Sequence, residues 1–575
     1  MMLKACFKKA LISLGGIIMN YTNEMNTLLL ISLLKKYNIK NIIASPGATN
    51  VSFVASIQID PFFNIYSAVD ERSAAFMACG LAEATKEPVV ITCTGATASR
   101  NYVPGLTEAY YKKLPILAVT ATLNTDKIGY YVPQLLDRTQ QPVDLAVWSE
   151  QVHSVNTKEE YSLIEIKINR ALIKLKNGPV HINLETKYSY DFSVKSLPNA
   201  RKINYIRCED EFPLILSGKV AVFVGAHDPF KKEEEEAIDK FCESYNAIVI
   251  CDQTSNYRGK YRILAPLMNS QSKHLSSYAF DLIIHIGYVS GAYIDFTAQE
   301  VWRVNKDGEL RDLYGNLSKV FAMDEIDFFK YYANETKTEE SLLKACQEDR
   351  NRLLGKIKDL PFSNIWIAQQ LASKLPENSV LHLGILNSLR AWNFFETPSS
   401  VTCFSNTGGF GIDGCLSSLI GAAYVNDDKQ YYIVLGDLAF FYDCNVLFNK
   451  IPNNVHIIVI NNGIGTEFKN YNHRVALFKE DANNYIAAKG HNGPKSLTLL
   501  KQFAFNNGLS YYSASTKEEF SLVKNDWLTN SSLLEVFTTD KDESDALRII
   551  NTLEVDNTAI YRDKLKRLIK KTLGR

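Results

Sequence analysis

The sequence lacks a net charge, because its 63 Lys and Arg residues equal its 63 Asp and Glu residues. Without an excess of either sign, the composition does not favour a nucleic acid or an anionic membrane as a partner. The apolar run near the start, from Ala10 to Met19, is too short to span a bilayer. We therefore expect a small-molecule partner, with no nucleic acid and no membrane.

Close pairs of cysteine are also missing. The ten cysteines are scattered over 575 residues and include no C-x-x-C pair, which argues against a zinc site. This usage is typical of reduced, buried thiols, so we expect a cytoplasmic protein. There is no internal repeat and no low-complexity tract, and the length predicts two to four domains.

The two ends of the chain are predicted to lie outside the folded core. Lys4, Lys8 and Lys9 precede the first apolar run and give residues 1–24 a weak likeness to a signal peptide. No clear small-residue cleavage site follows, so we interpret these residues as an extension, with Met19 or Met25 as alternative starts. Residues 551–575 form a basic tail.

Between the ends, the pattern predicts an α/β protein with three doubly wound parallel-sheet domains, at residues 25–186, 187–350 and 351–550. Short apolar runs that end near small residues alternate with helical stretches, as in βαβ units. The predicted strands are 41–45, 88–93, 115–120 and 178–184, then 219–225, 247–251 and 281–287, then 380–383, 401–405, 431–435 and 455–460.

Two neighbouring strands of the third domain end in polar turns. The strand YYIVL is followed by Gly436 and Asp437, and VHIIVI by Asn461 and Asn462, with a helix predicted between them from about Tyr442 to Lys450. A right-handed crossover brings both turns to the carboxyl edge of the sheet, where such sheets bind ligands. Carboxylate and amide oxygens suit Mg²⁺ that is shared with phosphates.

Glycines support the same interpretation. Gly436, Gly463 and Gly465 allow the backbone to approach a diphosphate closely. Each turn alone is equally consistent with a plain buried βαβ unit. The combination of two apolar strands, one helix and both turns favours a metal–diphosphate site.

This stretch resembles the thiamine-diphosphate-dependent enzymes, in which Gly-Asp-Gly precedes Asn-Asn by a similar interval; here it is 462 − 437 = 25 positions. Leu438 replaces the third glycine, and the form looks most like the menaquinone-pathway synthase branch. The resemblance implies a thiamine-diphosphate-binding fold with pyrimidine, central and diphosphate domains. It also implies thiamine diphosphate and Mg²⁺ as cofactors, with the metal held by Asp437, Asn462 and the Ile464 carbonyl.

Glu71 begins a small-residue helical stretch, ERSAAFMACGLA. On its own it is a first-turn acid that complements the helix dipole. The resemblance makes it catalytic, because in that family such a glutamate hydrogen-bonds N1′ of the cofactor's aminopyrimidine and thereby activates the cofactor. The family glutamate acts across a subunit interface, which implies a homodimer or homotetramer.

A third motif, SNTGGFGIDG from Ser405 to Gly414, resembles the same synthase branch. The resemblance implies that Ile412 is an apolar wedge under the cofactor and that the Phe410 carbonyl accepts from its amino group. The set of cofactor-binding residues implied is Gly436, Asp437, Leu438, Asn462, Gly465, Phe410, Ile412 and Asp413.

Arginines that hold substrate carboxylates in that branch are absent at four places. Their positions are Thr49, Thr407, Trp392 and the stretch 121–124. Each lost charge-assisted contact costs about 1.5–3 kcal/mol, so we expect the chemistry to be kept and the acceptor to be smaller or less anionic. The candidate substrate residues are Thr49, Asn50, Gln134, Ser388, Arg390, Thr407 and Glu467.

The predicted function is decarboxylation of a 2-oxo acid with transfer of the acyl carbanion equivalent to an acceptor. A simple 2-oxo acid decarboxylase is the nearest alternative, and a non-catalytic subunit of the same fold is another. A nucleotide-binding oxidoreductase is disfavoured because the central domain lacks G-x-G-x-x-G.

Overall fold

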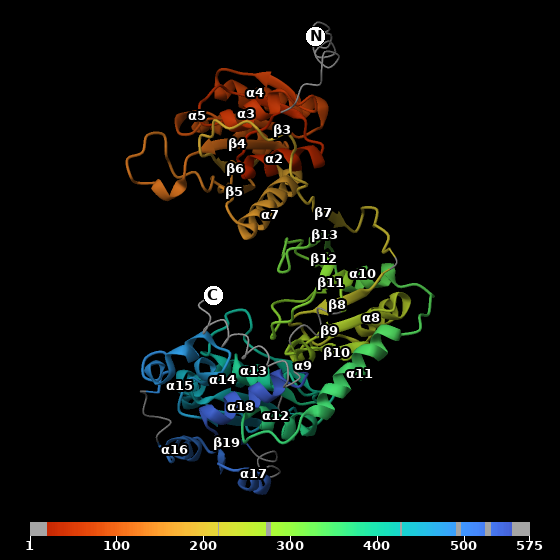
Figure 1. Ribbon diagram of the computed structural model, residues 1–575, viewed down its shortest axis with the longest axis vertical. Helices are drawn as coiled ribbons and strands as arrows, with labels where there is room; N and C mark the ends of the chain where they lie inside the picture. The colour runs from red at the N-terminus through yellow and green to blue at the C-terminus, as the bar shows by residue number, and fades with distance from the viewer. Residues whose placement is uncertain are drawn as a thin grey trace, which may run out of the picture. The chain divides into compact units, whose positions relative to one another are not determined.

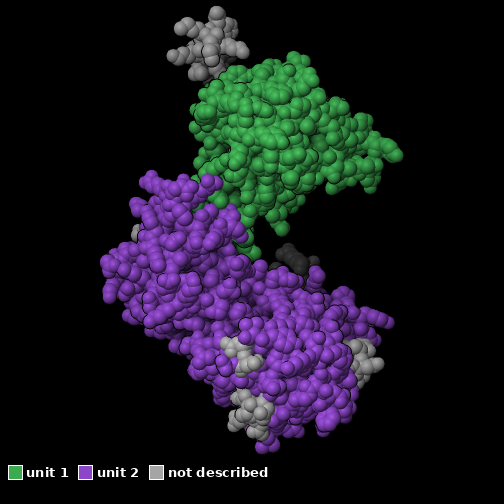
Figure 2. Space-filling model, turned by 180° about the vertical axis from the view of Figure 1, so that it is seen from behind, with its two compact units in different colours: residues 1–206, 309–320 green, residues 207–308, 321–575 purple. Residues whose placement is uncertain are grey.

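The computed structural model describes residues 20–216, 218–271, 278–425, 428–489, 496–523 and 531–554. Three sheets with flanking helices confirm the predicted α/β class (Figure 1). The chain divides into two compact units (Figure 2): unit 1 is residues 1–206 and 309–320, and unit 2 is residues 207–308 and 321–575. Most of the predicted N-terminal extension and the basic tail from residue 555 lie outside the described residues.

Unit 1 contains a six-stranded sheet of order β2-β1-β3-β4-β6-β5. All neighbouring strands of this sheet pair in parallel. The strands are β1 (Asn41–Ala44), β2 (Asn64–Ser67), β3 (Val89–Cys93), β4 (Ile116–Thr122), β5 (Trp148–Val152) and β6 (Val180–Glu185). Four of them confirm predicted strands, whereas β2 and β5 were not predicted.

Helices cover both faces of this sheet because successive strand side chains point to opposite sides. Ile42 packs in one apolar cluster and Ile43 in another. The first cluster includes residues of α2 (Met25–Lys36), α3 (Val51–Gln58) and α7 (Lys158–Lys174). The second includes residues of α4 (Glu71–Thr85) and α6 (Val103–Tyr111).

A seven-stranded sheet has the order β10-β9-β8-β11-β12-β13-β7. Its predicted strands are confirmed as β8 (Val220–Val224), β9 (Ile248–Cys251) and β11 (Phe280–Ile286). The others are β7 (Asn204–Arg207), β10 (Arg262–Leu264), β12 (Ala298–Val304) and β13 (Leu317–Ala322). Its helices include α8 (Lys232–Tyr245), α9 (Pro266–Asn269), α10 (Glu325–Tyr332) and α11 (Ser341–Lys356).

A six-stranded sheet that lies wholly in unit 2 has the order β15-β14-β16-β17-β19-β18, and its strands are parallel. They are β14 (Val380–Leu383), β15 (Thr402–Phe404), β16 (Tyr431–Gly436), β17 (Val455–Asn461), β18 (Ser510–Ala514) and β19 (Ser532–Phe537). The helices are α12 (Asn364–Leu371), α13 (Asn387–Trp392), α14 (Cys415–Ala423), α15 (Asp437–Asp443), α16 (Leu499–Asn506), α17 (Lys517–Val523) and α18 (Asp540–Asn551).

The helix between β16 and β17 begins earlier than predicted. It starts at Asp437 rather than near Tyr442, and a 3₁₀ turn, Cys444–Phe448, continues it. Asp437 is therefore the first helical residue after the strand. Its acidic side chain lies at the helix N-terminus, where a negative charge is favoured.

Within unit 2, side-chain hydrogen bonds link the segment after β9 to β15 and to the segment that precedes β15. Asn256, which follows β9, accepts a hydrogen bond from the Cys403 backbone N–H at 2.7 Å and donates to the Cys403 carbonyl at 2.9 Å. Gln253 donates to the Phe395 carbonyl at 2.6 Å. These groups are buried, so their hydrogen bonds are costly to leave unmade.

Close packing of α4 against α6 predicts a stability difference between two glycines. A Cβ on Gly105 meets the Ala75 Cβ at 2.4 Å, whereas a Cβ on Gly80 meets nothing within 4 Å. We expect Gly105→Ala to lower the free energy of unfolding by about 1–3 kcal/mol and Gly80→Ala to raise it by about 0.5–1 kcal/mol. Urea denaturation of both variants measures this, and equal effects would contradict the packing.

Candidate functional site

The two polar turns predicted from the sequence meet at one cavity of unit 2. It has a volume of about 180 Å³, and we call it the strand-edge cavity. Strand β16 pairs with β17 so that Gly436 lies opposite Ile460. Residues predicted for the cofactor or substrate that line it are Ser388, Ile412, Gly436, Asp437, Leu438, Asn462, Ile464, Gly465 and Glu467.

The side chain of Asp437 joins the two turns. It is only 2% exposed, and its Oδ2 accepts from the Gly463 N–H at 3.1 Å. Burial raises the pKa of Asp437 to about 7. A bound divalent cation would favour the ionised carboxylate, and the oxygen donors of Asp437 and Asn462 match the preference of Mg²⁺.

Side-chain hydrogen bonds hold the wall of this cavity. Thr466 Oγ1 accepts from Asn387 Nδ2 at 3.0 Å and from Asn462 Nδ2 at 3.4 Å. Ser388 Oγ accepts from Asn364 Nδ2 at 3.2 Å. The amide of Asn462 thus directs its nitrogen toward Thr466, and its Oδ1 accepts from the Ile464 N–H at 3.3 Å.

Glu543 lines the strand-edge cavity and was not predicted. It accepts from the Asn364 backbone N–H at 3.0 Å and from the Thr538 hydroxyl at 2.8 Å, both through Oε1. Burial raises its pKa to about 7. In the sequence it belongs to an acidic first turn, DKDE, which is ordinary helix-start chemistry, so only the fold reveals its burial.

A second cavity of unit 2, of about 390 Å³, shares Leu386 and Glu467 with the first. We call it the outer cavity. Two further predicted residues, Arg390 and Phe410, line it. Phe410 has a backbone φ of 54°, a left-handed conformation that costs a non-glycine residue free energy and is common at binding sites.

Two predicted residues of unit 2 line neither cavity. Asp413 is exposed, and Thr407 is buried, with its backbone N–H bonded to the Ser405 carbonyl at 2.8 Å. Their roles remain predictions.

In unit 1, Glu71 is the first residue of α4, after the N-cap Asp70. It is partly exposed, and its Oε2 accepts from Asn101 Nδ2 at 3.4 Å. Thr49 is buried and hydrogen-bonded to Thr94. Asn50 is also buried; it donates to the Ser45 carbonyl at 3.0 Å, a local turn contact, and borders an open cavity of about 990 Å³.

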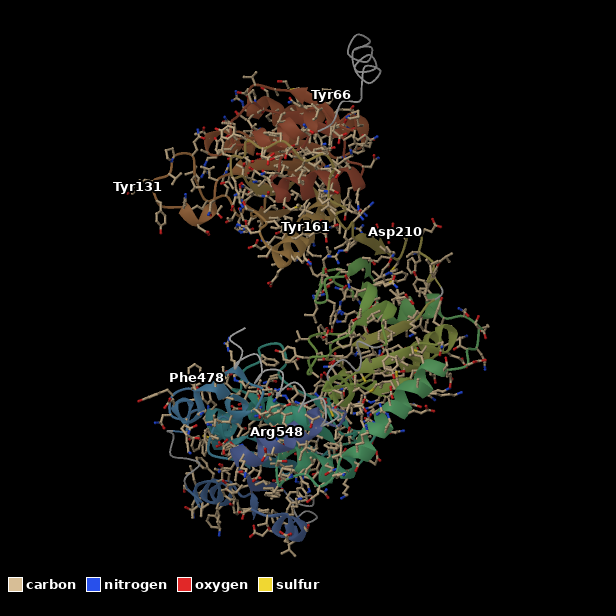
Figure 3. The ribbon with its side chains drawn as sticks, viewed as in Figure 1. Tyr66, Tyr131, Tyr161, Asp210, Phe478 and Arg548 are labelled. Atoms are coloured by element: carbon tan, nitrogen blue, oxygen red, sulfur yellow. The ribbon has the colours of Figure 1, made fainter. Side chains whose placement is uncertain are left out.

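Gln134 lies on the loop between β4 and β5. It is exposed and has a φ of 63°. Tyr131 of the same loop, labelled in Figure 3, projects away from the sheet at the loop's outer end. Among the described residues, no helix is long and apolar enough to cross a membrane, and no disulfide forms.

The chain is similar to known proteins over most of its length. Residues 27–143 match the family described as thiamine pyrophosphate enzyme, N-terminal TPP binding domain. Two relatives are both named 2-succinyl-5-enolpyruvyl-6-hydroxy-3-cyclohexene-1-carboxylate synthase. The Bacteroides thetaiotaomicron protein is 29% identical over 78% of this chain and 84% of its own length, and the Phocaeicola vulgatus protein is 27% identical over 92% and 98%.

A solved structure also aligns, the Rhodococcus jostii RHA1 thiamine diphosphate-dependent 4-hydroxybenzoylformate decarboxylase. Its sequence identity is 16%, its TM-score is 0.39, and the alignment covers 90% of this chain and 99% of that one.

The raised pKa of Glu543 predicts a pH-dependent stability difference. The folded protein keeps the proton up to about pH 7, whereas the unfolded chain loses it near 4.5. The wild type should therefore lose stability relative to Glu543→Gln as pH rises from about 4.5 to 7, by up to about 3 kcal/mol. Urea unfolding at several pH values measures this. Glu518→Gln, at an exposed position, is the control. If the free energy of unfolding changed with pH in parallel for wild type and Glu543→Gln, the raised pKa of Glu543 would be contradicted.

Proposed function

Because the chain is a thiamine-diphosphate-dependent enzyme that acts on a 2-oxo acid, near the branch of the synthases named above, we propose that it is a carboligase. It decarboxylates a 2-oxo acid and transfers the acyl carbanion equivalent to an acceptor carbonyl or alkene. The observation that carries this proposal is the strand-edge cavity, in which Asp437 and Asn462 meet.

We place Mg²⁺ on Asp437, Asn462 and the Ile464 carbonyl. These are hard oxygen donors on adjacent turns. They lie next to Gly436, where an added Cβ would meet nothing within 4 Å, so the backbone there leaves room for a diphosphate. Thiamine diphosphate, when bound, supplies a carbon nucleophile for the keto group and accepts the electron pair released with CO₂. The protein's contribution is placement and electrostatics.

Glu71 is proposed to act on the pyrimidine end of the cofactor from a second copy of the chain. It begins a helix of small residues, and its described side-chain hydrogen bond, to Asn101, is long. A carboxylate that hydrogen-bonds a ring nitrogen shifts the ring toward the tautomer able to remove a proton. Ile412 and the Phe410 carbonyl are proposed to hold the cofactor's shape from unit 2.

The acceptor is proposed to differ from that of the synthase branch. Thr49, Thr407 and Trp392 occupy positions of lost arginines, and the side chains of all three are buried. Without guanidinium groups at these positions, a multiply carboxylated acceptor loses its charge-assisted contacts.

Removing the proposed metal ligand should weaken cofactor binding. We expect Asp437→Asn to weaken Mg²⁺-dependent binding of thiamine diphosphate about a hundredfold, because one charged ligand is lost. Isothermal titration calorimetry with and without EDTA measures this, with Glu518→Gln as the control. Unchanged affinity in Asp437→Asn would exclude this metal site.

Removing the proposed activating carboxylate should leave binding intact and stop turnover. We expect Glu71→Gln to reduce CO₂ release from a panel of ¹³C-labelled 2-oxo acids by about 10²–10⁴-fold, while calorimetry shows cofactor binding within about tenfold of wild type. Glu83→Gln, on the exposed face of the same helix, is the matched control. Full turnover in Glu71→Gln would disprove its role, and CO₂ release without any ligated product would indicate a simple decarboxylase.

A further inference from the structure

We propose that the outer cavity binds an uncharged, hydroxyl-rich acceptor, and that Glu467 excludes carboxylates from it by neutralising Arg390. This proposal rests on the proposed carboligase function and specifies the acceptor class of the same site. Arg390 and Glu467 are both candidate substrate residues from the sequence, and the proposal gives them a joint role.

The geometry of the ion pair is bidentate. Arg390 Nη1 lies 2.7 Å from Glu467 Oε2, and Nη2 lies 3.0 Å from Oε1. Nη1 also donates to Asn387 Oδ1 at 2.7 Å. Both outer nitrogens of the guanidinium are therefore hydrogen-bonded within the protein. They bind Glu467 in the same bidentate geometry that would otherwise bind a substrate carboxylate.

Further hydrogen bonds hold the pair in place. Asn470 Nδ2 donates to Glu467 Oε2 at 3.2 Å and to Asn387 Oδ1 at 3.2 Å. Glu467 is mostly buried, with 19% of its side chain exposed, so water screens the pair only partly. A carboxylate that entered the cavity would have to displace Glu467 and would then face its negative charge.

The rest of the cavity wall carries amides and hydroxyls instead of charges. The polar residues besides the pair are Asn269, Ser270, Tyr293, Asn393, Asn472, His473 and Asn551. His473 Nδ1 accepts from the Val475 N–H at 3.2 Å. Apart from the Arg390–Glu467 pair, no Asp, Glu, Lys or Arg is among the described residues that line the cavity.

Two charged residues adjoin this wall in sequence: Arg474, which follows His473 and is exposed, and Arg548 of α18 (Figure 3), which is engaged. Arg548 lies 2.6 Å from Asp545 and over the ring of Tyr471. Arg548 is therefore paired within the protein and is not free to bind a substrate anion.

One donor in the wall has no partner. Asn393 is 1% exposed; its Oδ1 accepts from the Gln253 N–H at 2.8 Å, but its Nδ2 makes no hydrogen bond in the described structure. A buried amide N–H without an acceptor is costly, and Asn393 is one of the amide residues that line the outer cavity.

The test uses succinate as the anionic probe and erythritol as the neutral one. Binding to the full chain is measured by saturation-transfer NMR, without cofactor and again with thiamine diphosphate and Mg²⁺. Wild type should give a saturable signal for erythritol and only a weak one for succinate. Glu467→Gln should raise succinate affinity at least about tenfold, and the double variant Glu467→Gln/Arg390→Gln should lose that gain. Thermal midpoints confirm that each variant is folded.

Succinate binding by wild type that matches Glu467→Gln would overturn the proposal, as would a gain that persists in the double variant. Absence of an erythritol signal at any concentration would overturn the neutral acceptor class. The binding measurements without cofactor need no turnover. A wrong acceptor class would therefore appear in the probe binding, whereas a wrong carboligase proposal would appear as missing CO₂ release.

Discussion

The parallel pairing of β16 with β17 is the constraint on which the rest of the site depends. Parallel strands joined by a helical crossover bring their carboxyl ends to one edge. The Gly436–Asp437 turn therefore meets the Asn462–Gly463 turn, and a backbone N–H of one bonds the carboxylate of the other. A shift of this register would separate the oxygen donors and remove the cavity between them.

The two cavities of unit 2 differ in how the negative charge of their glutamates is neutralised. In the strand-edge cavity, burial favours the protonated form of Glu543, so this acid would not repel a diphosphate at or below neutral pH. In the outer cavity, the negative charge of Glu467 neutralises the positive charge of Arg390. The first arrangement suits an anion that arrives with its own metal, whereas the second suits a neutral molecule.

Much of the fold followed from local sequence patterns. Eleven predicted strands are present, because apolar runs that end at small residues report parallel strands directly, and Asp437 and Asn462 were predicted to meet. Edge strands such as β2, with mostly exposed side chains, carry no such signal. Glu543 could not be predicted either, since its burial comes from packing with Asn364, which lies 179 positions away. The Arg390–Glu467 pair joins residues 77 positions apart, so the sequence alone did not reveal that these two candidate substrate residues form an ion pair.

The central claim is that Glu71 of one copy and Asp437 of another serve the same cofactor. Mixing Glu71→Gln with Asp437→Asn chains after co-expression tests it most directly, because each variant alone is inactive. If sites are shared between copies, half of the dimers are mixed and one of their two sites is intact, so CO₂ release should recover to about a quarter of the wild-type rate. If mixed dimers form and no activity returns, the carboxylate and the metal site do not act together across copies, and the account fails.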